Sequence, residues 1–215
     1  MIKVFFDTNI LKFSATELRR LVPKEVEPIQ WGDILIDSPV YDIVTINPNE
    51  NIKNEKLRKE ADLLPHISDL AKNDRIKLVT HHETLLESWG IPNMDSLSGK
   101  FYNAPYDLIE APIGYSRAII GYGIDADKEQ LNFISSIKDK RFIEIQKATG
   151  AYQGKGKYSR NQLLDAWHIW CAEHNQCNYF LSMDFKLIRM ISNNKRWEST
   201  LKIAPPSVVI NEIKT

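Results

Sequence analysis

Four acidic residues occupy positions where α/β proteins carry chemistry. Asp7 and Asp184 each closely follow a short apolar run of strand-forming residues, and Glu87 lies about one turn into the segment after a third run. Asp165 interrupts an otherwise apolar helical stretch, where a carboxylate is costly unless it is paired, hydrogen-bonded or bound to a metal. Because the carboxyl ends of parallel strands share one edge of a sheet, we expect these acids to meet there.

Helix and strand dimensions link Asp165 to Asp184. A helix from Asp165 to Asn175 descends about 15 Å at 1.5 Å per residue. The following strand, from Cys177 to Ser182, climbs back about 16 Å at 3.3 Å per residue. Asp184 is therefore predicted to return to the level of Asp165.

Two alternatives remain open at this stage. Asp7 also suits a helix cap, since an acid before Thr8 can accept from the first backbone N–H groups. Glu83 competes with Glu87, because Thr80–Glu83 has the same capping-box spacing as Thr84–Glu87 and the two acids are four residues apart on one helical face. Glu87 is the preferred candidate.

Converging carboxylates call for a cation. At ~4 Å each pair of like charges costs ~1 kcal/mol in water, and several times more at a lower dielectric constant. Hard oxygen ligands favour Mg²⁺ or Mn²⁺ over zinc. Such sites suit phosphodiester hydrolysis, in which the ion binds the phosphate and activates water.

The elements that must position these acids alternate along the chain. Strands are expected at 2–6, 76–80, 179–182 and 201–204, with the last strand running into a turn. Helices are expected from about 8 to 21, over 53–73 with a break near Pro65, after the second strand, and over 125–149, 160–175 and 185–193. This alternation predicts an α/β fold with a mostly parallel central sheet.

Two segments interrupt this plan within a single domain of residues 1–215. Residues 29–46 are rich in β-branched and aromatic residues between turn signals, which predicts an inserted hairpin of two or three short strands. Residues 93–123 hold many aromatic, glycine and proline residues and are expected to be irregular.

Composition limits the class of protein. The 28 basic and 28 acidic residues balance, which argues against a generalised polyanion binder. No apolar run is long enough to span a membrane, and no secretory signal is expected. The two cysteines lack the spacing of a metal site and are expected to be free thiols, so a cytoplasmic location is expected.

Four motifs together resemble the PIN domain, the nuclease fold of VapC-type toxins and related RNA-processing enzymes: Phe6–Leu11, Thr84–Glu87, Leu164–Ala166 and Leu181–Asp184. The resemblance implies a three-layer α/β/α fold and a metal-dependent endoribonuclease, with a toxin of a toxin–antitoxin pair as one form. It implies that Mg²⁺ or Mn²⁺ and its water are held by Asp7, Glu87, Asp165 and Asp184. Asn9 and Ser182 would then orient the acids or the phosphate.

Basic residues near these motifs are candidates for RNA binding. Lys155, Lys157 and Arg160 precede the Asp165 helix with an interleaved tyrosine, and Lys186 follows Asp184. The alternative for the first three is a solvated loop. His168, three residues after Asp165, can reach the site, although a satisfied core histidine is the preferred interpretation. RNA is the expected partner, and an antitoxin protein and a second copy of the chain are further candidates.

Two other functions use the same residues differently. A non-catalytic RNA-binding or protein-interaction module would keep the fold and bind without cleaving. A phosphatase with Asp7 as nucleophile would need a second acid two residues later, where this chain has Asn9.

Overall fold

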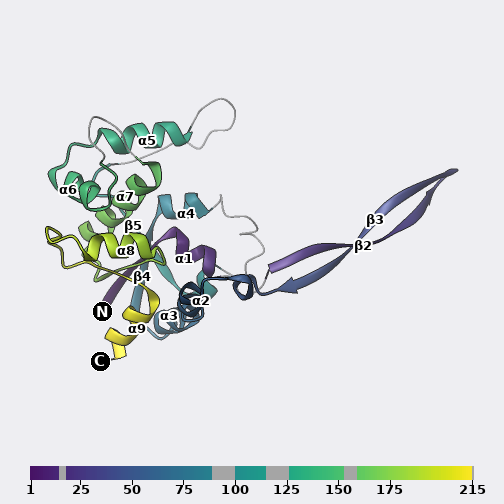
Figure 1. Ribbon diagram of the computed structural model, residues 1–215, viewed down its shortest axis with the longest axis horizontal. Coiled ribbons are helices and arrows are strands. Elements are labelled where there is room, and N and C mark those ends of the chain that lie inside the picture. Colours follow the sequence, from purple (N-terminus) through teal and green to yellow (C-terminus); the bar gives the residue numbers. More distant parts are fainter. Residues whose placement is uncertain (15–17, 89–99, 115–125, 153–158, 215) are drawn as a thin grey trace.

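The computed structural model describes residues 1–14, 18–88, 100–114, 126–152 and 159–214. In this part of the chain, five parallel strands form one sheet in the order β5–β4–β1–β6–β7 (Figure 1). Their bounds are β1 Ile2–Phe6, β4 Ile76–His81, β5 Tyr106–Ile109, β6 Tyr179–Leu181 and β7 Lys202–Ala204. The predicted α/β class and parallel sheet are confirmed.

Helices cover both faces of this sheet. Successive side chains of a strand point to opposite faces, and Phe5 of β1 is buried in one apolar cluster while Val4 and Phe6 are buried in another. The Phe5 cluster includes residues of α5 (Ala126–Ser136), α6 (Lys140–Ala148), α7 (Arg160–His174) and α8 (Phe185–Ser192). The Val4 cluster includes residues of α1 (Thr8–Phe13), α2 (Glu55–Ala61), α3 (Leu64–Lys72) and α9 (Pro206–Lys214).

The first helix is shorter than predicted. It ends at Phe13 rather than near Leu21, because Ser14 closes it with its backbone N–H and hydroxyl on the carbonyl of Leu11. From Leu18 the chain forms a strand instead, β2 (Leu18–Trp31). Pairing with β3 (Ile34–Ile46) along almost its whole length overrides the local helical pattern.

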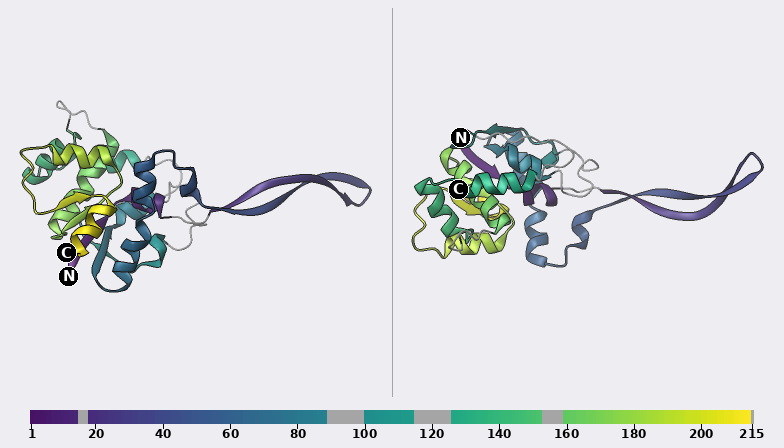
Figure 2. Two further views of the ribbon diagram at one scale, coloured as in Figure 1. Left: turned by 60° about the horizontal axis from the view of Figure 1, so that its bottom comes forward. Right: turned by 90° about the horizontal axis from the view of Figure 1, so that it is seen from above.

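The inserted hairpin is accordingly longer than the predicted 29–46. Strands β2 and β3 form a two-stranded antiparallel sheet of their own, with one register shift between Pro23 and Val26. Gly32 in the turn has φ +62°, a conformation that glycine adopts without strain. The hairpin projects far from the body of the molecule (Figure 2).

Several smaller predictions were also wrong. Within the 93–123 segment, β5 joins the sheet beside β4, and Phe101 stacks on Phe6 with ring centroids 5.4 Å apart. The 125–149 helix is two helices, because Asp139 caps α6. Helix α9 replaces the expected last turn, and a 3-10 turn spans Pro48–Asn51.

The remaining helices agree with their predicted ranges. The 53–73 segment is the pair α2 and α3, and α4 (His82–Ser88) follows β4 directly. Across the described ranges, no helix combines the length and apolarity needed to cross a membrane.

Candidate active site at the carboxyl edge of the sheet

The ends of β1 and β6 bring two acids to the same edge. The two strands are parallel neighbours, and the backbone N–H of Asp7 donates to the carbonyl of Leu181 at 3.1 Å. Asp7 follows β1 immediately, and Asp184 follows β6 after two residues. The predicted juxtaposition of strand ends therefore holds for these two residues.

Asp7 is buried and fixed in orientation. Its Oδ1 accepts from the backbone N–H of Thr8 at 2.8 Å, so it does cap α1, the alternative left open by the sequence. Its Oδ2 accepts from the side-chain amide of Asn9 and from the hydroxyl of Ser182, the latter at 3.2 Å. Capping and membership of the acid cluster are thus compatible, because they use different oxygens.

Asn9 and Ser182 join the two strand ends. The amide of Asn9 also donates to Ser182 Oγ at 2.9 Å, and its Oδ1 accepts from the backbone N–H of Met183 at 2.9 Å. Ser182 Oγ in turn accepts from the backbone N–H of Asp184 at 3.1 Å. These two side chains have the placement that the resemblance implied for groups supporting the acids.

Asp184 begins α8 as its N-cap. Its Oδ1 accepts from the backbone N–H groups of Lys186 and Leu187 at 2.8 and 3.0 Å. Lys186, exposed beside it, lines the same cleft of about 250 Å³ as Asp184 and Asp165. The other residues that line this cleft are Ser159, Asn161, Gln162, Leu187 and Met190.

Asp165 faces this cleft from the second turn of α7. Burial is the main cause that raises the pKa of Asp165 to about 8, and the charges of Asp7, Asp184 and Glu87 raise it further against an opposing effect of His168. Asp7, Asp184 and Glu87 therefore each act electrostatically on Asp165.

The pKa of Asp7 is perturbed in the same direction. Burial raises it to about 6, Glu87 adds to the rise, and His168 with the hydrogen bonds from Thr8 and Ser182 opposes it. The edge of the sheet thus holds two carboxyls that resist ionisation while they are desolvated and face one another.

Glu87, rather than Glu83, belongs to this group. Glu87 Oε2 accepts from the hydroxyl of Thr8 at 2.6 Å, which ties α4 to α1. Glu83 points elsewhere, to the side-chain amide of Gln130 on α5. The predicted capping box is wrong, because α4 begins at His82 and Thr84 lies inside it.

His168 is the residue whose place sequence reasoning undervalued. It is buried, as preferred, but its Nε2 lies 3.0 Å from Glu87 Oε1 and its Nδ1 lies 3.2 Å from the hydroxyl of Thr84. Burial alone would lower its pKa, but the charge and hydrogen bond of Glu87, with Asp7 and Asp165, raise the pKa of His168 to about 9. The sequence did contain a signal for this place, because His168 lies three residues after Asp165 on the same helix.

The pKa of Glu87 is shifted in the opposite direction, below its ordinary value. Burial tends to raise its pKa, but the charge and hydrogen bond of His168, the hydroxyl of Thr8 and the charge of Arg160 together lower it. Glu87 and His168 therefore form an ion pair inside the acid cluster.

The candidate RNA-binding residues are only partly within the described chain. Arg160 opens α7, and its guanidinium lies 3.5 Å from Gln130 Oε1. Lys186 lines the cleft, as above. Lys155 and Lys157 lie outside the described residues.

The chemistry of these donors fits a hard divalent cation. The carboxylates of Asp165 and Asp184 in the cleft and of Asp7 at the end of β1 offer oxygen, which Mg²⁺ and Mn²⁺ prefer. A cation would also relieve the repulsion that raises the pKa values of Asp7 and Asp165. In the described ranges, no three histidine, cysteine or acidic side chains already stand in a coordinating arrangement.

Comparison with known proteins gives no family assignment. No protein-family model matches the chain, and no curated protein matches it significantly.

Proposed function

We propose that this protein is a metal-dependent endoribonuclease that hydrolyses RNA phosphodiester bonds on a PIN-like α/β/α fold. The observation that carries the proposal is the electrostatic convergence of Asp7, Glu87, Asp165 and Asp184 at one edge of the sheet. Their order along the chain also follows the motifs of the PIN resemblance.

Each acid has a role that its environment supports. Asp7, Asp165 and Asp184 are the proposed ligands of Mg²⁺ or Mn²⁺, and Glu87 the fourth carboxylate of the set. The bound ion would neutralise the scissile phosphate and lower the pKa of a water molecule. Asn9 and Ser182 hold Asp7 by hydrogen bonds, and His168 with Thr8 holds Glu87.

Basic residues around the cleft are the proposed contacts with the RNA. Lys186 lines the cleft, and Arg160 begins the helix that carries Asp165. Positive side chains on both sides of a carboxylate site bind the phosphates that flank the scissile bond. Lys155 and Lys157, just before Arg160 in sequence, are proposed to extend this contact. A cytoplasmic toxin with a protein antitoxin is the specific form that the resemblance suggests.

The test is RNA cleavage by the purified protein with Mg²⁺ or Mn²⁺. Cleavage should stop in excess EDTA, and Asp7→Asn should reduce it by at least about 100-fold, since a metal ligand and its charge are lost. Asp69→Asn, which removes an exposed acid on α3, is the matched control and should retain full activity. Undiminished cleavage in EDTA would overturn the metal mechanism.

The same experiment separates the non-catalytic alternative. A binding module would retain RNA affinity without any divalent ion, would not cleave, and would bind equally well with Asp165→Asn. That combination of results would replace the nuclease proposal.

A further inference from the structure

The hairpin of β2 and β3, residues 18–46 and here called the arm, exposes large apolar side chains. Trp31, Leu35, Ile43 and Ile34 are 76, 71, 67 and 66 % exposed. A two-stranded ribbon with no covering layer is marginally stable in water, and large exposed apolar patches mark interaction sites. Among the described residues nothing covers the arm's outer part, and Figures 1 and 2 show it standing clear of the body.

Part of this apolar surface forms a patch on one face at the end of the arm, while Leu35 lies on the other face. In the antiparallel register Ile29 lies opposite Ile36, and Trp31 lies opposite Ile34. Directly opposed residues share a face of the ribbon, and the two pairs are two positions apart, so all four side chains lie on the same face. They are called the tip patch.

The charge of the arm's outer half limits the partners it can take. Residues 25–41 contain four acidic residues and no basic residue, so the rest of the chain holds 28 basic and 24 acidic residues. Like charge disfavours RNA on this segment, and it also disfavours two tips packed on each other. A basic surface with some aromatic area is the complementary partner.

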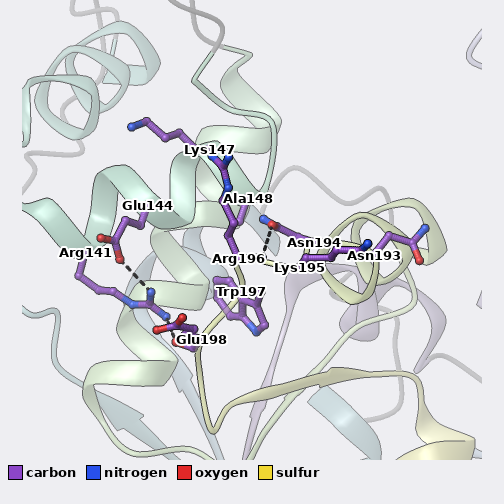
Figure 3. A pocket seen from close by; sticks show the side chains of 10 residues that line it. All are labelled: Arg141, Glu144, Lys147, Ala148, Asn193, Asn194, Lys195, Arg196, Trp197 and Glu198. Atoms are coloured by element: carbon purple, nitrogen blue, oxygen red, sulfur yellow. Dashed lines mark hydrogen bonds and ion pairs between the residues drawn. The ribbon is translucent and has the colours of Figure 1, made fainter.

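The body of the same protein carries such a surface. A cavity of about 900 Å³ opens between the end of α6 and the segment after α8 (Figure 3). Its lining holds the half-buried Trp197 and more basic than acidic residues, namely Arg141, Lys147, Lys195 and Arg196 against Glu144 and Glu198. Arg141, also in the lining, is bound to Glu144 at 3.1 Å and to Glu173 at 2.6 Å.

A copy of the protein cannot fill this cavity with its own arm. Helix α6 lies at the end of the molecule opposite the arm in every view (Figures 1 and 2). The arm has strands of 14 and 13 residues and reaches about 45 Å at 3.3–3.4 Å per residue. That reach is enough to cross the body of a neighbouring molecule.

We propose that the arm of one copy docks across the body of a second copy, with its acidic outer half at the basic cavity. The exchange is reciprocal, so that two identical contacts close a two-fold dimer. One face of the arm measures about 450 Å², and two arms on two bodies would bury about 1,800 Å², the size of a stable protein interface. This dimer does not depend on the proposed nuclease function.

A charge exchange between the two surfaces tests the proposal by sedimentation or light scattering. The arm variant Asp33→Lys/Asp37→Lys and the body variant Lys195→Glu/Arg196→Glu each place like charges at both contacts. Each alone should weaken self-association by at least about 100-fold relative to the wild type. An equal mixture should form a heterodimer, because each arm then meets a body of opposite charge.

Two further variants separate the apolar contribution from a folding defect. Trp31→Ser/Ile34→Ser removes half of the tip patch and should also give monomers. Val208→Ser, at an exposed apolar position on α9, should remain dimeric. Urea unfolding of every variant should match the wild type when both are measured at concentrations too low for self-association, since none of these side chains belongs to the core.

Four results would overturn the proposal. The first is a wild-type protein that stays monomeric at high concentration, and the second is charge variants that dimerise normally. The third is an equal mixture of the arm and body variants that stays monomeric. The fourth is an arm that binds a different basic protein while the wild type remains a monomer.

Discussion

Replacing Asp165 by asparagine should stabilise the metal-free protein. The side chain is half-buried, lies in a cleft with Asp184 and feels the charges of Asp7 and Glu87. Asparagine keeps the shape of the neutral acid and removes the need to hold a proton. The site therefore lowers stability in the absence of a cation.

The magnitude follows from the difference in pKa between the two states. The pKa of Asp165 is about 8 in the folded protein, and its ordinary value is 3.8. At a pH between these two values, the folded state therefore holds a proton that the unfolded state has lost. Stability then falls as the pH rises through this window. At 1.36 kcal/mol per pKa unit the cost is about 4 kcal/mol at pH 7 and about 2 kcal/mol at pH 5. Because the amide must itself be desolvated, we expect a gain of about 2–4 kcal/mol at pH 7.

Urea unfolding in EDTA measures this gain, with Asp69→Asn as the exposed control. The difference between Asp165→Asn and the wild type should shrink at pH 5. Excess Mg²⁺ or Mn²⁺ should stabilise the wild type by mass action and leave Asp165→Asn nearly unchanged. A variant that is no more stable than the wild type at pH 7, or whose gain is the same at both pH values, would refute the reasoning.

Three further substitutions probe the supporting contacts. Asn9→Ala removes an amide that binds Asp7 and joins the two strand ends, so affinity for Mn²⁺, measured by calorimetry, should fall about 10–100-fold. His168→Gln breaks the buried pair with Glu87 and should cost about 3 kcal/mol in urea unfolding at pH 7; an unchanged midpoint would contradict the pair. Arg141→Ala loses its two hydrogen bonds to the carboxylate of Glu173 on α7. This change should lower the free energy of unfolding by about 1–2 kcal/mol without altering RNA cleavage.

The acids at the strand ends were predictable because simple geometry governs them. Asp7 and Asp184 follow neighbouring parallel strands, and the rise per residue of helix and strand brings Asp165 level with Asp184. The choice between Glu83 and Glu87 was beyond such rules, since both share one helical face. It is decided by side chains far away in sequence, namely Gln130 for Glu83 and His168 for Glu87.

The arm could be predicted only in part from the sequence. Its turn at Gly32 and the β-branched residues around it gave a local signal, so a hairpin was predicted. The beginning of its first strand, up to about Leu21, was assigned to a helix, because apolar residues such as Leu18 and Leu21 also fit a helical spacing. Long-range pairing with β3 decides between the two, as it does for β5 beside β4.

The acid cluster and the arm are held by separate interactions. Every hydrogen bond that fixes the carboxylate of Asp7 comes from Thr8, Asn9 or Ser182, and none comes from the described side chains of the arm. The arm is inserted between α1 and α2, outside the five-stranded sheet of the described residues. Changes in the arm's length or charge should therefore leave the acids in place. If both proposals hold, a monomeric arm variant will cleave RNA as fast per copy as the wild type, and slower cleavage would mean that the second copy contributes to the site.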